Sequence, residues 1–170
     1  MSTGSITCRN LTIYGGVGSI SEITATILNL GSHDLTTTNI TIGYSDVATP
    51  GQYQAKIRFG TGTHVITALQ GAGEYAYGYV EFEYSSISVG GNIDLRYLAT
   101  VEVESTITLV GSGNQLLYFG GTVTSPNEFG DLIVDKPSGR AMMQDGWSIA
   151  NFVGIRGDFD VNGFVMRVGY

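Results

Sequence analysis

Residues 10–43 read NLTIYGGVGSISEITATILNLGSHDLTTTNITIG, and this stretch decides the expected fold. Three short runs rich in β-branched residues each end in a large residue followed by glycine, at Tyr14-Gly15, Leu30-Gly31 and Ile42-Gly43. The spacings of 16 and 12 residues make this a loose repeat. Short strands that cannot bury a face alone stack on themselves or on other copies of the chain. The stretch therefore favours an assembled structural protein over a solitary enzyme.

The composition of the whole chain is that of strands and turns. Its 170 residues fit one domain, or a domain with a short appendage. Charged residues make up 14%, well under the usual quarter, and glycine, threonine, serine, isoleucine and valine take their place. Because apolar residues reach 42%, the chain is not of a disordered type.

The charge pattern excludes two classes of partner. Net charge is −7, the only lysines are Lys56 and Lys136, and the arginines are scattered singly. Nucleic-acid binding requires clustered basic residues that displace counterions from phosphates, and anionic membrane surfaces attract the same clusters. No apolar run is long enough to cross a bilayer. We expect neither a nucleic-acid partner nor membrane insertion.

The N-terminal sequence MSTGSITCRN lacks the basic and apolar regions of a signal peptide. Cys8 is the only cysteine, so an intrachain disulfide is impossible. These features indicate a protein made in a cytosol, whereas the composition resembles that of extracellular β proteins. Virion proteins combine both properties, because they fold in the host cytoplasm and work outside it.

The residue pattern predicts an all-β chain, since no 3.6-residue periodicity persists. In the segment 35–44, alternation puts Ile40 and Ile42 on one face of a strand. Residues 52–59 and 63–70 are predicted to form a hairpin around Gly60-Thr61-Gly62. We expect an antiparallel β-sandwich or jelly-roll-like domain.

The break at Thr49-Pro50-Gly51 divides this expected architecture into two parts. Residues 1–44 would form an N-terminal β-strand assembly segment, and residues 45–170 would form the antiparallel domain. A single domain is the alternative.

The C-terminal segment carries the clearest local signal. Residues 151–161 and 164–170 flank Asn162-Gly163, a pair that favours a type I′ hairpin turn because both positions reach positive φ. Asp158, Asp160 and Asn162 also match the first half of a calcium loop, which makes them weak candidate metal ligands. The twelfth position of such a loop needs a bidentate acid, but here it is Gly169. The pattern favours the hairpin, and we expect no metal and no cofactor.

Two acid pairs raise the possibility of glycoside hydrolysis, which uses two carboxylates. Glu81 with Glu83, and Glu102 with Glu104, each point to one face of a predicted strand. The simpler interpretation makes them the solvated face of a sheet. We therefore predict no catalytic residues and keep a small jelly-roll glycoside hydrolase as an alternative.

Aromatic residues provide the other alternative, a carbohydrate-binding module. Tyr75, Tyr77 and Tyr79 share one strand face, and Trp147 is the only tryptophan. Aromatic rings can stack on sugars, although tyrosine is also common in sheet packing and at interfaces. These four residues are the candidate glycan contacts.

The segment 18–43, GSISEITATILNLGSHDLTTTNITIG, resembles the threonine- and isoleucine-rich repeats in stalks of bacteriophage tail fibres and spikes. Those stalks are typically trimers in which strands of three chains wrap a common axis. The resemblance implies a non-enzymatic virion protein, serving as a tail fibre, spike or capsid decoration. Its partners would be copies of itself, other virion proteins, and a glycan or receptor on the host surface.

A homo-oligomer of this kind, most simply a homotrimer, would be held together by apolar faces of the N-terminal segment. The candidate interface residues are Ile23, Ile27, Leu30, Ile40 and Ile42.

Overall fold

The chain forms a parallel β-solenoid, seen in a computed structural model. The structure describes residues 4–14, 26–43, 55–71, 78–82, 84–96, 98–101, 105–119 and 127–169. The all-β prediction is confirmed for this part of the chain. The predicted antiparallel sandwich or jelly roll is wrong, because every strand pairing runs parallel.

The strands follow one another along the chain with no helix between them in the described residues. Their bounds are β1 (Ser5–Tyr14), β2 (Thr26–Asn29), β3 (Asp34–Gly43), β4 (Ala55–Arg58), β5 (Thr63–Gly71), β6 (Gly78–Glu81), β7 (Ser86–Val89), β8 (Ile93–Asp94), β9 (Leu98–Val101), β10 (Thr106–Leu109), β11 (Gln115–Tyr118), β12 (Asn127–Met143), β13 (Trp147–Asp160) and β14 (Met166–Val168).

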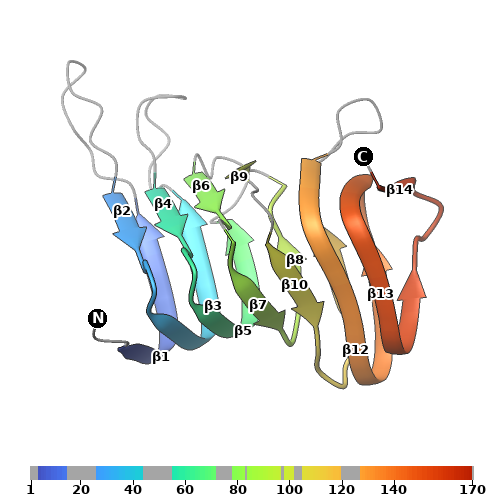
Figure 1. Cartoon of the computed structure of the whole chain (residues 1–170), viewed down its shortest axis with the longest axis horizontal. Coiled ribbons are helices and arrows are strands. Elements are labelled where there is room, and N and C mark those ends of the chain that lie inside the picture. The colour runs from blue at the N-terminus through green and yellow to red at the C-terminus, as the bar shows by residue number, and fades with distance from the viewer. Residues whose placement is uncertain are drawn as a thin grey trace.

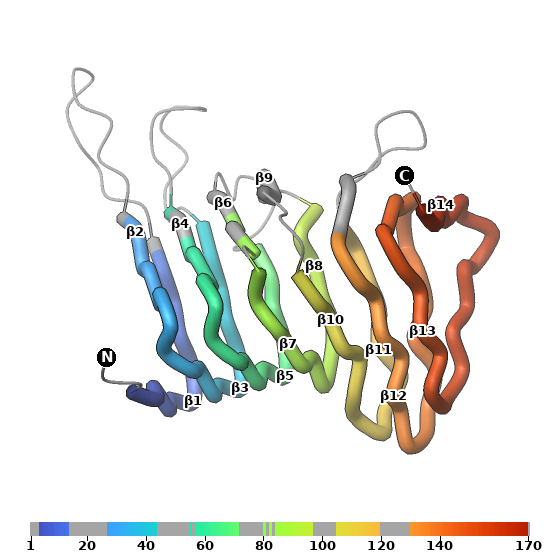
Figure 2. The backbone as a smooth tube through the Cα atoms, viewed as in Figure 1, coloured from blue at the N-terminus to red at the C-terminus, as the bar shows by residue number. Residues whose placement is uncertain are grey.

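Two sheets line the solenoid. One follows the order β1-β3-β5-β7-β10-β12-β11-β8, with β13 on β12 and β14 on β13, and the other follows β2-β4-β6-β9. Figure 1 shows the coils side by side from β1 at the N-terminal end to β13 and β14 at the C-terminal end. The backbone tube in Figure 2 follows the same progression.

The first coils repeat every 29 residues. Ser5 pairs with Asp34 and Leu35 pairs with His64, so each side chain lies over its equivalent in the next coil. Asn39, for example, donates to the Asn10 side chain 29 positions earlier, at 2.9 Å. Stacking of equivalent residues lets each coil bury the apolar face of its neighbour.

Glycines make the corners between sheets. The sequence Gly60-Thr61-Gly62 separates β4 from β5, but these strands lie in different sheets and each pairs with a strand of another coil. The Thr61 amide donates to the Gly31 carbonyl at 2.7 Å. The predicted hairpin is therefore a solenoid corner, because a glycine turn alone does not say which strand the returning chain will meet.

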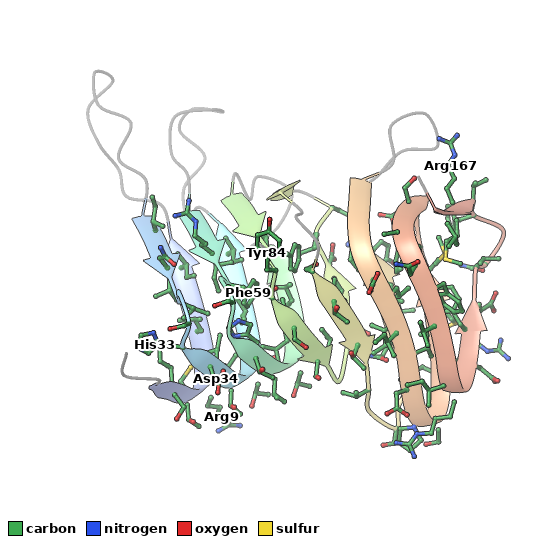
Figure 3. The ribbon with its side chains drawn as sticks, in the orientation of Figure 1. Arg9, His33, Asp34, Phe59, Tyr84 and Arg167 are labelled. Carbon is green, nitrogen blue, oxygen red and sulfur yellow. The ribbon has the colours of Figure 1, made fainter. Side chains whose placement is uncertain are left out.

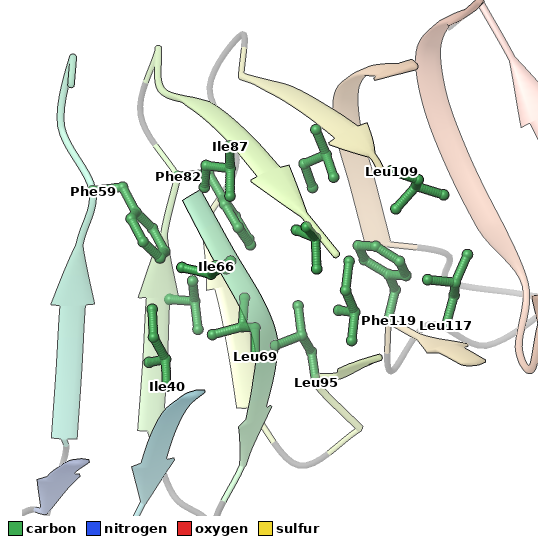
Figure 4. Close-up of a cluster of buried hydrophobic side chains, with 14 of the residues drawn as sticks. Ile40, Phe59, Ile66, Leu69, Phe82, Ile87, Leu95, Leu109, Leu117 and Phe119 are labelled. Carbon is green, nitrogen blue, oxygen red and sulfur yellow. The ribbon is translucent and has the colours of Figure 1, made fainter. Parts of the chain in front are cut away.

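The core lies between the sheets and is mostly apolar. Ile40 and Ile42 are both buried, which confirms the face that alternation assigned to them. Phe59 and Phe82 stack with ring centroids 5.8 Å apart. Figure 4 shows these rings and the neighbouring aliphatic side chains turned toward one another between the strands.

The expected division near residue 45 falls in residues 44–54, which lie outside the described part of the chain. On either side of it the sheets are continuous, because β3 pairs with β5 and β2 pairs with β4.

The Asn162-Gly163 turn forms as predicted, with φ of 49° and 77° and a bond from the Phe164 amide to the Val161 carbonyl. Its flanks do not form a hairpin, since β14 pairs in parallel with Trp147–Ile149 at the start of β13. The turn chemistry was predicted correctly, but the strand pairing was not.

Candidate functional site

The C-terminal coils carry a bulge that the N-terminal coils lack. One column of paired residues runs from Cys8 to Val134, and another runs from Leu11 to Met143. In the first coil the two columns lie three residues apart along the chain (8 to 11), whereas in β12 they lie nine residues apart (134 to 143). The extra residues extend the turns of the C-terminal coils beyond those of the N-terminal coils (Figure 2). We call this projection the shoulder; it comprises residues 110–114, 135–140 and 156–160.

A buried lysine holds the shoulder together from inside. The Lys136 ammonium donates to the Gln115 side-chain oxygen at 2.6 Å and to the Gly111 carbonyl at 3.2 Å. Gln115 in turn donates to the carbonyls of Val89 and Gly91. Burial lowers the pKa of Lys136, since desolvation penalises the ammonium form. The network satisfies the carbonyl groups of the turn that precedes β11.

The outer surface of the shoulder is polar and carries both signs of charge. Arg140 contacts Asp160 at 3.2 Å and Asp158 at 3.9 Å, and Arg156 pairs with Asp135. Beside Arg140 lies an open hollow of about 290 Å³. Its lining is Asn114, Gly139, Arg140, Met142 and Asp158. It offers donors, a carboxylate and one half-buried apolar side chain.

Of the three candidate calcium ligands, Asp158 and Asp160 belong to the shoulder, where both contact Arg140, and Asn162 follows it. The Asp160 carboxylate accepts from the Asn162 amide at 2.8 Å and pairs with Arg140, while Asn162 donates to the Met143 carbonyl. Across the described residues, no group of three His, Cys, Asp or Glu side chains could hold a metal ion.

The last long strand leaves one side of its backbone open. β14 covers Trp147–Ile149, and the Gly169 amide reaches the carbonyls of Ile149 and Ala150. From Asn151 to Asp160, β13 pairs only with β12 within the part of the chain that the structure describes. We call this open side the C-terminal edge.

Large apolar side chains surround the C-terminal edge. Their exposed fractions run from 38% to 62%, the highest being that of Ile155. They are Val153, Ile155, Val161, Phe164, Val165 and Val168. Large exposed apolar side chains gathered on one coil commonly mark an interaction site.

The candidate interface residues do not belong to the apolar surface at the C-terminal edge. Leu30, Ile40 and Ile42 are buried in the core of their own chain and have no surface left for a neighbour. Ile27 is 53% exposed on the side of the solenoid, and Ile23 lies outside the described residues.

Of the four candidate glycan contacts, Tyr79 and Trp147 lie within the described residues. Tyr75 and Tyr77 lie outside the described residues, and Tyr79 belongs to β6. Trp147 is buried, with its ring centroid 4.0 Å from that of Phe119 and its indole nitrogen donating to Asp145 at 2.7 Å. It packs the core and offers no ring face to a sugar.

Of the four candidate catalytic glutamates, Glu81 ends β6, while Glu83, Glu102 and Glu104 lie outside the described residues. The shoulder and the C-terminal edge were not predicted. One signal was available, because Leu132, Val134 and Lys136 share a parity that points all three side chains inward.

Within the described residues, no helix has the length and hydropathy needed to cross a bilayer. No family model, curated protein or solved structure matches the chain.

Proposed function

We propose that the chain is a non-enzymatic structural protein of a phage virion, a fibre, spike or decoration component that works by associating with copies of itself. The observation that carries the proposal is the C-terminal edge with its apolar surroundings. An unpaired strand edge next to exposed apolar side chains is a template for another chain, and soluble proteins usually cover or blunt it.

Several features of the chain support this assignment. A solenoid built from stacked threonine, isoleucine and asparagine columns suits an extended, charge-poor component exposed to solvent. The stalk resemblance of residues 18–43 favours a virion surface, and it favours three copies. The burial of Leu30, Ile40 and Ile42 moves the expected contact away from the N-terminal segment and toward the C-terminal coil.

Light scattering on the purified chain over a dilution series tests the proposal. We expect the mass of two or more copies, persisting into the micromolar range. A single-copy mass at every concentration would remove the basis for a self-assembling structural role.

A second candidate function is glycan binding, favoured by the hollow beside Arg140. An arginine, a carboxylate and an amide beside the half-buried Met142 can bind vicinal hydroxyl groups, because together they offer donors and acceptors. Saturation-transfer NMR with millimolar neutral sugars tests this function. The signal should disappear in Arg140→Ala and persist in Arg96→Ala, since Arg96 lies outside the hollow. No transfer to any sugar would exclude it.

A further inference from the structure

We propose that the C-terminal coil binds the C-terminal coil of a second copy, tail to tail, across a two-fold axis at the bend of β13. This contact rests on the proposed self-association and specifies its surface and symmetry. The occupant of the C-terminal edge is thereby a second copy of this chain.

The backbone of the C-terminal edge can bind another β-strand. Between Asn151 and Asp160 the backbone uses one side for β12, so the amides and carbonyls on the other side face outward. A β-strand of another chain satisfies these groups by extending the sheet. The neighbouring Val153 and Ile155, 45% and 62% exposed, supply apolar contact area for it.

The strand at the N-terminal end of the larger sheet, β1, does not suit this position. β1 lies at the opposite end of the solenoid from β13, and Arg9 lies at that end (Figures 1 and 3). β1 has three residues from Cys8 to Leu11, whereas β12 uses nine between the same two columns. β1 therefore cannot follow the outline of the shoulder. If β1 of a second copy stacked on β13 in the register of the solenoid, where Asp135 pairs with Arg156, its Arg9 would lie beside Arg156. Two like charges would then face each other.

The C-terminal edge suits a second copy of itself. β13 bends at Gly157, where φ is +94° and Lys136 packs against the backbone. A two-fold axis through this bend sets β13 of the second copy antiparallel to β13 of the first. The arm before Gly157 in one copy then lies beside the arm after Gly157 in the other. Arg156 of each copy then meets Asp158 of the other, so opposite charges face each other twice. The arm with Val153 and Ile155 lies along the arm with Phe159 and Val161.

This symmetry also closes the assembly. A head-to-tail contact repeats without limit and produces filaments, whereas a two-fold contact ends at two copies. A lateral trimer of the stalk type would use other surfaces, so both contacts together would give six copies.

Distances between spin labels in the full chain test the arrangement. A nitroxide is attached at Ile155→Cys, or at Ile6→Cys as the matched control, each in a Cys8→Ser background. One copy stacks β1, β3, β5, β7, β10, β12 and β13 about 4.8 Å apart, so each copy adds about 34 Å to a head-to-tail stack. Tail-to-tail pairing predicts a distance below about 25 Å between labels at position 155 and about 60 Å between labels at position 6. Distances of about 34 Å at both positions would indicate head-to-tail stacking and would overturn the proposal.

The mass of the assembly distinguishes the two proposals. Two or six copies are expected, and three copies would overturn the tail-to-tail contact while leaving self-assembly intact. A single copy would overturn both.

A pair of matched variants completes the test. Ile155→Lys should weaken the association at least tenfold, whereas Ile27→Lys, at a similarly exposed isoleucine on the side of the solenoid, should not. Circular dichroism confirms that both variants are folded. Equal association by the two variants would contradict the proposed surface.

Discussion

The N-terminal and C-terminal coils use the same fold in different ways. Between β1 and β5 the coils repeat every 29 residues, and equivalent residues stack directly, as Asn10 and Asn39 do. Between β12 and β13 the repeat is 20, as in the bond from Asn151 to Asp131, and the register shifts around the shoulder. Regular stacking builds a closed core, whereas irregularity creates the surface that a partner or ligand can use.

The largest expected effect comes from the corners that make regular stacking possible. A Cβ at Gly60 would lie closer than 3.0 Å to the Gly31 carbonyl oxygen, and φ there is +67°. Gly60→Ala should lower the free energy of unfolding by about 3–5 kcal/mol, because backbone must move and the conformation is strained. Urea denaturation measures it.

The control for this corner is Gly31→Ala. Its φ of +59° is similar, but a Cβ there meets nothing within 4 Å. We expect a loss of only about 1–2 kcal/mol. Equal losses at Gly31 and Gly60 would show that coils are not packed against each other at these glycines.

The next effect concerns the shoulder of the C-terminal coils. Lys136→Ala removes a buried side chain and leaves the Gln115 oxygen and the Gly111 carbonyl without this donor. We expect a loss of about 2–4 kcal/mol in the free energy of unfolding. Lys136→Met restores most of the volume but no donor, so the difference between the variants separates packing from hydrogen bonding. Wild-type stability in Lys136→Ala would mean that the shoulder does not depend on this lysine.

A smaller, pH-dependent effect belongs to the N-terminal coils. His64 lies in the core between Leu35 and Ile87, and its Nε2 lies 3.1 Å from the Phe59 carbonyl. Burial lowers the pKa of His64 below 6.5, despite the opposing effects of that carbonyl and of Asp34. The unfolded chain therefore binds the proton more tightly, and stability should be full above pH 6.5 and fall as the pH drops below it.

Melting temperatures between pH 5 and pH 8 check this dependence. His64→Leu should flatten that part of the profile, since the group that titrates differently in the two states is gone. A slope that survives in His64→Leu would have to come from other groups.

The smallest effect is expected on the surface of the shoulder. Arg140 and Asp160 form a partly exposed pair, with side-chain exposures of 50% and 38%. A double-mutant cycle with Arg140→Ala and Asp160→Ala should give a coupling energy of about 0.5 kcal/mol or less, reduced further by salt. A coupling above about 2 kcal/mol would mean that this pair stabilises the bulge itself.

The sequence revealed strands and faces but not their pairing. Alternation placed Ile40 and Ile42 on one face, but we expected that face to contact other copies, whereas it is buried in the core of its own chain. The Asn162-Gly163 turn formed as expected. The period of two is the same in parallel and antiparallel strands, so it could not decide between a solenoid and a sandwich. The glycine turns at residues 60–62 then favoured the more common hairpin.

A signal for the solenoid was nevertheless present. The sequences Asn10-Leu-Thr-Ile13 and Asn39-Ile-Thr-Ile42 are 29 residues apart, which is the spacing at which Asn10 and Asn39 stack. The glycine spacings of 16 and 12 residues do not show this repeat, because they mix strands with corners. The shoulder and the C-terminal edge could not be found in this way. Both depend on where the pairing register between neighbouring coils changes.

Hydrogen exchange at two protein concentrations tests most directly whether copies meet at the C-terminal coil. We predict that outward-facing amides of residues 151–160 become protected as the concentration rises, while amides on the open side of β1 exchange at an unchanged rate. Protection that grows on β1 but not on residues 151–160, or on neither, would contradict this account.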